Sequence, residues 1–275
     1  MILISDQKDL TNFLNEKPFK STKLTLVPTM GNLHEGHLKL VEQAGSVSNF
    51  VCVSIFVNPL QFGPEEDFSS YPRTLSEDLS KLEKTNCSLV FAPKVDDITF
   101  GIKQQKADPF LSSIMCGKTR HNHFDGVVTV VNRLFELFQP KITFFGEKDY
   151  QQLMIIKEFV ERKKLKIAVE GVATERELSG LAKSSRNSYL SGEEKKKAAL
   201  IHKTLINLKQ LLLDFNGIDS VIQQAKESLE KNDFNVEYLE ARDRYTLKES
   251  SDPNNIILLC AATLNKVRLI DNLKL

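Results

Sequence analysis

The 275-residue chain has almost no excess of charge of either sign, since 37 lysines and arginines stand against 36 aspartates and glutamates. A nucleic acid or an anionic membrane surface attracts a basic excess, so this balance predicts neither kind of partner. Glycine and proline are also sparse, at 12 and 9 residues, while 41% of the residues are hydrophobic. This composition excludes collagen-like, low-complexity and disordered chains and is typical of a globular protein.

Cysteines are few, and no two of them have the spacing of a metal-binding motif: Cys52, Cys87, Cys116 and Cys260. Reduced, structural thiols are the expected state. Long apolar runs are missing, because no segment approaches a length of about 18 residues, which a membrane span requires. Charged residues within the first ten positions interrupt the apolar segment that a signal peptide would need. We therefore expect a cytoplasmic protein with no membrane partner.

Strand-like and helix-like segments alternate along the first part of the chain. Runs of β-branched and aromatic residues predict strands at 24–27, 50–57, 88–92, 142–145 and 166–172. Apolar residues at spacings of three and four predict helices at 37–47, 75–84, 127–138 and 150–163. This alternation predicts an α/β fold, in the form of a Rossmann-like doubly wound parallel sheet with helices on both faces.

The pattern changes after about residue 190. Two helices, at 193–213 and 219–231, are followed by strand-like segments at 255–262 and 267–270. These elements predict a second, smaller α+β domain at the C-terminus. We place the first domain at residues 1–180 and the second at residues 181–275.

The segment between the first predicted strand and the first long helix, residues 28–37, ends in His34-Glu35-Gly36-His37. In a doubly wound fold, ligands bind beyond the carboxyl ends of the strands, where a helix N-terminus offers N–H groups to phosphate. Gly36 lets phosphate oxygens approach, and His34 and His37 both offer N–H donors. The pattern indicates a triphosphate site. A surface feature or half a metal site is the alternative for a histidine pair alone.

Two further loops follow predicted strands. Gly146-Glu147-Lys148-Asp149 opens a helix, and Lys183-Ser184-Ser185-Arg186 combines hydroxyls with a guanidinium, a combination that binds phosphate oxygens well. Each loop alone is also typical of a solvated surface, and Asp149 is a plausible N-cap. Three such loops at three strand ends favour phosphate binding.

Six segments together resemble the pantoate–β-alanine ligase family, which belongs to the HxGH nucleotidylyltransferase-like superfamily. They are Pro28 to His37, Ile55 to Phe62, Tyr71 to Leu75, Phe145 to Gln152, Ser184 to Asn187 and Arg268 to Asn272. The resemblance covers nearly the whole chain. It implies an ATP-dependent, AMP-forming ligase that joins pantoate to β-alanine through a pantoyl adenylate and releases pyrophosphate. The product, pantothenate, is a coenzyme A precursor.

The resemblance also implies roles for individual residues. The catalytic residues would be His34, His37, Lys148 and Arg186. ATP would be bound by Met30, Gly31, His34, Gly36, His37, Gly146, Glu147, Lys148, Asp149, Glu175, Lys183, Ser184, Ser185 and Arg186. Pantoate would be bound by Gln61 and Gln152, with Gln61 also linked to β-alanine. Magnesium would bridge the phosphates, with Asp78 as its protein ligand, because hard cations prefer oxygen ligands.

Further expectations follow from the same resemblance. The first domain would bind the nucleotide and pantoate and form a homodimer, and the second would act as a lid. The alternative function is a nucleotidyltransferase that leaves the nucleotide on its product. Against it, Gln61 and Gln152 are neutral amides where a phosphorylated acceptor would require additional cations.

The sequence departs from the family pattern at several positions. Where the family has Arg-Pro-Gly-His-Phe, this chain has residues 120–124, Arg-His-Asn-His-Phe, so the shape of that loop is open. His121 and His123, with Cys116 nearby, would be a metal-site alternative, although no further ligand spacing supports it. Lys183 stands where the family has an apolar residue, and we expect it to add a cation to the phosphate loop.

Overall fold

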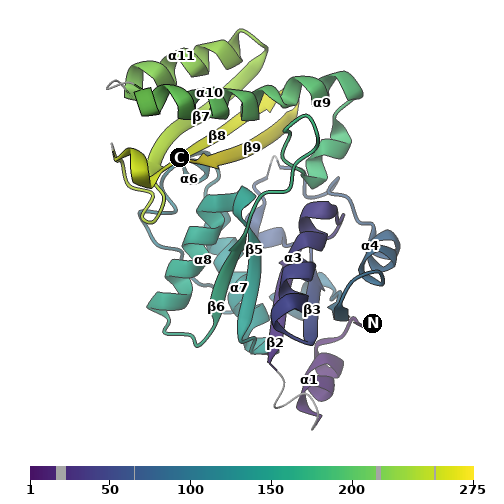
Figure 1. The fold of residues 1–275 in the computed structure, drawn as a ribbon. Helices are drawn as coiled ribbons and strands as arrows, with labels where there is room; N and C mark the ends of the chain where they lie inside the picture. Colours follow the sequence, from purple (N-terminus) through teal and green to yellow (C-terminus); the bar gives the residue numbers. More distant parts are fainter. Residues whose placement is uncertain (17–22, 65, 215–217, 251) are drawn as a thin grey trace. The chain divides into compact units, whose positions relative to one another are not determined.

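The computed structural model describes residues 1–16, 23–64, 66–214, 218–250 and 252–275 (Figure 1). The chain divides into two compact units. Residues 1–147 and 155–173 form the first unit, and residues 148–154 and 174–275 form the second. The predicted ranges of 1–180 and 181–275 differ from these units at residues 148–154 and 174–180, which pack with the C-terminal part. The assignment of a catalytic domain and a lid domain stays a prediction.

The first unit is built on a six-stranded sheet with the order β1-β4-β3-β2-β5-β6. Its strands are β1 (Ile2–Ile4), β2 (Leu24–Thr29), β3 (Phe50–Ile55), β4 (Cys87–Phe91), β5 (Ile142–Gly146) and β6 (Ala168–Val172). Every neighbouring pair is parallel. From β2 the chain proceeds outward to β3 and β4, and from β5 it proceeds the other way to β6, so the topological switch point lies between β2 and β5.

Helices pack against both faces of this sheet, as predicted. The helices between residues 1 and 162 are α1 (Gln7–Asn15), α3 (Glu35–Val47), α4 (Leu75–Leu82), α5 (Val95–Thr99), α6 (Cys116–Thr119), α7 (His123–Phe138) and α8 (Tyr150–Arg162). One core joins Leu40 and Val41 of α3 to Val90 of β4. The next residue of β4, Phe91, points to the opposite face and meets Phe138 of α7 edge to face. The sheet is therefore covered by α3 on one side and α7 on the other.

The second unit contains a three-stranded antiparallel sheet in the order β7-β8-β9 (Figure 1). Its strands are β7 (Phe234–Asp243), β8 (Ile256–Leu264) and β9 (Val267–Lys274), and its helices are α9 (Gly192–Ala198), α10 (Leu200–Asp214) and α11 (Ile218–Glu230). Short 3₁₀ turns are η3 (Ser185–Tyr189) and η4 (Pro253–Asn255). A core that includes Leu205, Leu208 and Leu258 joins the helices to the sheet. The α+β character of this unit is confirmed.

Two strands were not predicted. Strand β1 has three residues, which is too short for a recognisable alternation. Strand β7 does alternate, since Phe234, Val236 and Tyr238 are buried while Asn235 is exposed, so its pattern was overlooked. The predicted helix at 193–213 is two helices that meet at Ala199.

The four cysteines are free and buried. Burial raises the pKa of Cys87 to about 11 and raises the pKa of Cys52 well above its ordinary value. Thiols in this state are inert, which agrees with a structural role. Within the described ranges, no helix has both the length and the apolar character needed to cross a membrane.

Candidate active site

The two histidines of the first predicted loop cap helix α3, and each accepts a backbone N–H that determines which of its ring nitrogens carries the proton. His34 is the N-cap of α3, and its Nδ1 accepts the N–H of Gly36 at 3.2 Å. The Nδ1 of His37 accepts the backbone N–H of His34 at 3.3 Å. Because a neutral imidazole carries one proton, these bonds place that proton on Nε2 of both rings. Each histidine therefore offers an Nε2–H donor at the N-terminus of α3.

This helix N-terminus lies at the switch point of the sheet, since α3 follows β2 and β2 pairs with β5. Open parallel sheets bind ligands at the switch point, and a helix N-terminus there attracts anions. Gly146 ends β5 at the same edge, and a Cβ added to it would meet no atom within 4 Å. The first unit thus brings the histidines and the end of β5 to one edge, as predicted.

Asp78 of helix α4 holds the turn that precedes His34. Its fully buried carboxylate accepts the N–H of Asn32 at 2.9 Å and the N–H of Leu33 at 2.7 Å. Thr74 donates its hydroxyl to the same carboxylate at 3.2 Å. Gly31 in this turn has a φ of +80°, a conformation that favours glycine. Asp78 therefore acts on the histidine loop through backbone N–H groups, a role that the sequence did not suggest.

Gln61 lies in a 3₁₀ turn, η1 (Pro59–Gln61), after strand β3. Its Oε1 accepts a hydrogen bond from Nδ2 of Asn58 at 3.0 Å, and the same nitrogen donates to the carbonyl of Gly126 at 3.1 Å. A Cβ on Gly126 would lie 2.0 Å from the carbonyl oxygen of Leu60, so only glycine lets α7 approach this turn. The bond from Asn58 directs the Nε2 donors of Gln61 away from it, an orientation that suits a carboxylate or hydroxyl ligand.

The atypical loop at residues 120–124 supports the same turn. Nδ1 of His123 donates to the carbonyl of Gln61 at 2.7 Å, and its Nε2 accepts from Arg120 at 2.9 Å. Arg120 in turn binds both carboxylate oxygens of Glu66 at 2.7 Å. Asn122 has a φ of 60° and so supplies a left-handed conformation that asparagine tolerates well.

The pKa of Glu66 reflects this network. Burial raises the pKa of the carboxyl, but the hydrogen bonds and charge of Arg120 outweigh burial and hold it below its ordinary value. Both ring nitrogens of His123 are engaged by protein atoms. No support therefore remains for the metal-site alternative at His121, His123 and Cys116. Sequence reasoning missed Glu66, which carries no local signal because its partner lies far along the chain.

Met30 and Glu147 belong to the first unit, and the remaining candidate residues belong to the second. Lys148 lies on the short turn η2 (Glu147–Asp149), and its Nζ pairs with Asp149 at 3.1 Å. Its backbone carbonyl accepts a hydrogen bond from Nδ2 of Asn272 at 3.0 Å. Gln152 lies in the first turn of α8, two residues after Tyr150, whose hydroxyl donates to the carbonyl of Arg244 at 2.8 Å.

The serine-rich loop is short and ordered by its own side chains. Ser184 caps η3, and its hydroxyl accepts the N–H of Arg186 at 3.3 Å. Lys183 donates its N–H to the carbonyl of Glu175 at 2.9 Å, which pairs these two predicted ATP-binding residues. Within the second unit, the turn at Lys148 and the segment 174–187 are both bonded to strand β9.

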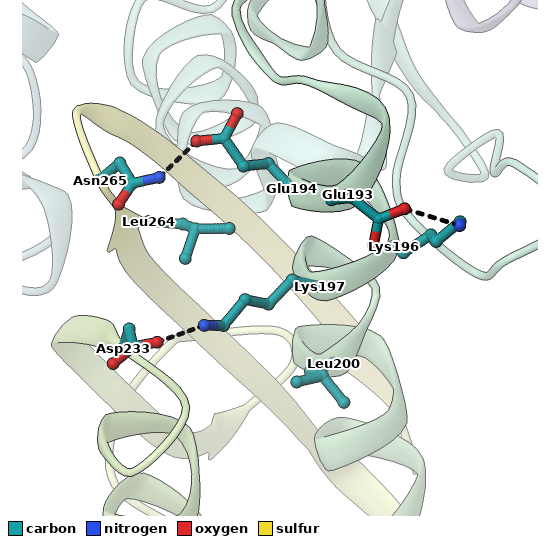
Figure 2. A pocket seen from close by; sticks show the side chains of 8 residues that line it. All are labelled: Glu193, Glu194, Lys196, Lys197, Leu200, Asp233, Leu264 and Asn265. Carbon is teal, nitrogen blue, oxygen red and sulfur yellow. Dashed lines mark hydrogen bonds and ion pairs between the residues drawn. The ribbon is translucent and has the colours of Figure 1, made fainter.

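A surface pocket in the second unit contains none of the predicted site residues (Figure 2). Figure 2 shows that its polar side chains pair with one another: Lys196 with Glu193, Lys197 with Asp233, and Asn265 with Glu194. Leu200 and Leu264 supply its apolar lining. The lining carries three carboxylates, Glu193, Glu194 and Asp233, against two lysines that are each paired with one of them, so the pocket has no cation left to bind the phosphates of a nucleotide.

The sheet order and the histidine-bearing helix at its switch point define the class of the protein, a doubly wound α/β protein with its candidate site at the carboxyl ends of the strands. Within that class, the family model of pantoate–β-alanine ligase matches residues 2–274. The chain belongs to this family, whose members are ATP-dependent ligases that form pantothenate from pantoate and β-alanine.

Individual relatives agree with this membership. The chain is 46% identical over 262 residues to the pantothenate synthetase of Idiomarina loihiensis, covering 93% of this chain and 92% of that one. It is 45% identical over 251 residues to the pantothenate synthetase of Acinetobacter baumannii, covering 90% and 89%.

Solved structures show the same likeness. The crystal structure of pantothenate synthetase from Thermus thermophilus matches with a TM-score of 0.93 at 38% identity and covers 100% of this chain and 99% of that one. A Francisella tularensis pantoate–β-alanine ligase, solved with a βγ-ATP compound and β-alanine, matches with a TM-score of 0.81 at 30% identity and covers 100% and 97%.

Proposed function

We propose that the chain catalyses the ATP-dependent ligation of pantoate and β-alanine to pantothenate. In the first step, the pantoate carboxylate attacks the α-phosphorus of ATP, and pyrophosphate leaves. In the second step, the amine of β-alanine attacks the acyl carbon of pantoyl adenylate, and AMP leaves. The observation that carries the proposal is the pair of Nε2–H donors on His34 and His37 at the N-terminus of α3.

The histidines act on the charge that develops during adenylation. In-line attack places negative charge on the phosphate oxygens and on the leaving pyrophosphate, and fixed donors aimed there contribute about 3 kcal/mol each. His37 donates to the departing phosphate, and His34 is its partner on the triphosphate. The bonds at Nδ1 keep both rings in the donor tautomer before ATP arrives, so no proton has to move between the ring nitrogens.

The second unit supplies cations for the same ATP in this proposal. Lys148 and Arg186 bind phosphate oxygens, while Ser184 and Ser185 close over the outer phosphates. A guanidinium offers several donors in one plane, which suits the phosphate oxygens of a nucleotide. Lys183 adds a further positive charge to this loop.

The other ATP-binding residues serve the nucleoside. Met30 and Gly31 line its pocket beside the histidine loop, with Gly36 allowing close approach of the phosphates. Asp149 contacts the ribose, and Glu175 acts through its backbone on adenine. Gly146 and Glu147, at the end of β5, are the remaining residues that bind ATP in this proposal.

Gln61 and Gln152 bind pantoate. A neutral amide donates to a hydroxyl or carboxylate without repelling the carboxylate and without weakening its attack on phosphorus, as an opposing cation would. Gln61 is well suited to this role because Asn58 occupies its Oε1 and His123 holds its backbone carbonyl. In the second step Gln61 also contacts β-alanine.

In this proposal magnesium binds together with ATP and neutralises charge on its phosphates. Among the residues that the structure describes, no group of three or more histidine, cysteine, aspartate or glutamate side chains could hold a metal ion. Asp78, the predicted protein ligand, accepts hydrogen bonds from Asn32, Leu33 and Thr74. The surroundings of Asp78 therefore do not fit a magnesium site.

The family resemblance supports three further proposals. The chain forms a homodimer through its first domain, works in the cytoplasm, and uses its C-terminal domain as a lid over the acyl adenylate. An adenylate hydrolyses readily, so exclusion of water would protect it. Light scattering of the purified chain tests the dimer directly.

A product assay tests the proposed function. ATP with pantoate is expected to yield pyrophosphate, and AMP is expected to appear once β-alanine is added. If the nucleotide remains on the product after β-alanine is added, the chain is a nucleotidyltransferase and the ligase proposal is wrong.

A further inference from the structure

Two adjacent residues of strand β9 each bind a different loop of the second unit. Asp271 binds Arg176 through both of its carboxylate oxygens, at 2.7 and 2.8 Å. Its neighbour Asn272 donates from Nδ2 to the carbonyl of Lys148 at 3.0 Å. Asp271 and Asn272 are 5% and 6% exposed, so water competes little for these bonds.

Arg176 lies in the hairpin that leads into the serine-rich loop. It forms an antiparallel bridge with Ala182, and its Nη1 donates to the carbonyl of Gly180 at 3.0 Å. One guanidinium therefore closes the hairpin and attaches it to β9. Ser184 follows the hairpin directly, so its position depends on that attachment.

The same guanidinium reaches the second loop through one further residue. Nη2 of Arg176 donates to the carbonyl of Asn272 at 3.2 Å, and the side chain of Asn272 holds Lys148. The two loops thus share one support, although Lys148 and Arg176 lie in separate segments of the chain. The hydrogen bonds of Arg176 and Asn272 are sufficient to connect the two loops.

We propose that Arg176, Asp271 and Asn272 are positioning residues that hold Lys148 and the loop at 183–186 at a fixed spacing along the triphosphate. The proposal rests on the proposed function, because it takes Lys148 and Arg186 as phosphate ligands. Two cations stabilise a moving pyrophosphate only when their separation matches that of its oxygens. The shared attachment to β9 sets this separation.

The energetics of the pair favour positioning over stability. Desolvation offsets most of the attraction within a buried ion pair, so such a pair is a poor source of folding free energy. It does fix geometry, because a bidentate arginine–carboxylate contact allows one orientation. Loss of one partner leaves the other charge unpaired and lowers stability as well. The exchange rate of each variant is therefore compared at a temperature at which a thermal melt shows that variant folded.

Two variants test the two contacts of β9 separately. Asn272→Ala removes the bond to Lys148, and Asp271→Asn weakens the bond to Arg176. Both are expected to lower the rate of pantoate-dependent ATP–pyrophosphate exchange about tenfold, the rate equivalent of about 1.4 kcal/mol. The KM for β-alanine is expected to stay unchanged, because the second step does not use the triphosphate.

A matched control lies on the same strand. Arg268 of β9 binds both carboxylate oxygens of Glu237 at 2.8 and 3.0 Å, and no hydrogen bond described for this pair involves either loop. Glu237→Gln therefore tests the loss of a similar pair, and its exchange rate is expected to stay within twofold of the wild type. A drop as large as that of Asp271→Asn would overturn the proposal.

A double variant and a second readout complete the test. In a Lys148→Ala background, Asn272→Ala is expected to cost nothing further, and independent, additive losses would contradict a role through Lys148. Amide hydrogen exchange measures the loops without activity: Asn272→Ala should speed exchange at 148–154, and Asp271→Asn at 174–187. Unchanged exchange in both segments overturns the proposed support, whereas a wild-type chain that releases no pyrophosphate overturns the proposed function instead.

Discussion

His37 accepts the backbone N–H of His34 at 3.3 Å, and the centroids of the two rings lie 4.1 Å apart. His34 is itself the N-cap of the same helix, so each histidine satisfies an N–H of the first turn with one ring nitrogen. The other ring nitrogen then carries the proton. Helix capping and donation to phosphate are thus combined in one pair of side chains.

Replacement of His37 by alanine is expected to lower kcat by about 10² to 10³ while the protein stays folded, the scale of losing one preorganised donor. Steady-state kinetics and a thermal melt measure the two effects. His37→Asn is the matched control, because its Oδ1 can accept the same N–H but its short side chain lacks the Nε2 donor. It should retain stability better than the alanine variant and be as inactive. A near-normal kcat in either variant would contradict the assigned role.

Asp78→Asn tests whether Asp78 holds the histidine turn or a metal ion. An amide keeps one acceptor oxygen and places an N–H₂ group against a backbone donor, so the variant should lose about 1 to 3 kcal/mol of stability. Chemical denaturation measures this loss.

The magnesium dependence of the same variant distinguishes the two roles. If Asp78 acts on the turn, activity falls but the magnesium concentration for half-maximal rate is unchanged. A large increase in that concentration would restore the predicted metal role of Asp78.

The sequence predicted the parts of the structure that have a local signal. The alternation of strands and helices and the loop at residues 28–37 are patterns within short windows, and the sheet order agrees with them. Arg176 and Asp271 are 95 positions apart, and Arg120 and Glu66 are 54 apart, so no window contains either pair.

Asp78 shows a different limit of sequence reasoning. An aspartate near a phosphate loop is chemically suited both to a magnesium ion and to backbone N–H groups, because both seek carboxylate oxygens. Only the direction and burial of the side chain distinguish the two, and these depend on how α4 packs against the turn that follows β2. The residue type was enough to predict that Asp78 lies near the phosphate loop, but only the folded structure shows which groups its carboxylate binds.

Gln152→Ala is expected to raise the KM for pantoate with little change in the KM for ATP, because it removes a contact to the acid alone. Gln152→Glu keeps the shape and adds a negative charge that repels the pantoate carboxylate, so its effect should be larger. Initial rates at varied pantoate measure both. A wild-type pantoate KM in the alanine variant would remove Gln152 from the site.

Lys183→Met is expected to raise the KM for ATP about two- to fivefold, which is the scale of one partly exposed charge. Lys183→Arg keeps the positive charge and should stay close to the wild type. Because contributions of exposed charges fall with salt, the difference between the two variants should shrink at high ionic strength. An unchanged KM in the methionine variant would show that Lys183 does not act on ATP.

His202 is expected to make stability depend on pH in the mildly acidic range. Burial lowers its pKa below the ordinary value of 6.5, the charge of Arg176 lowers it further, and Asp271 acts in the opposite direction. The unfolded chain therefore binds the proton more readily than the folded one, so stability is fully present above about pH 6.5 and falls as the pH drops below it. His202→Asn removes this titration. Unfolding measured from about pH 5 to pH 7.5 should show a flatter dependence than in the wild type, and parallel curves would contradict the assignment.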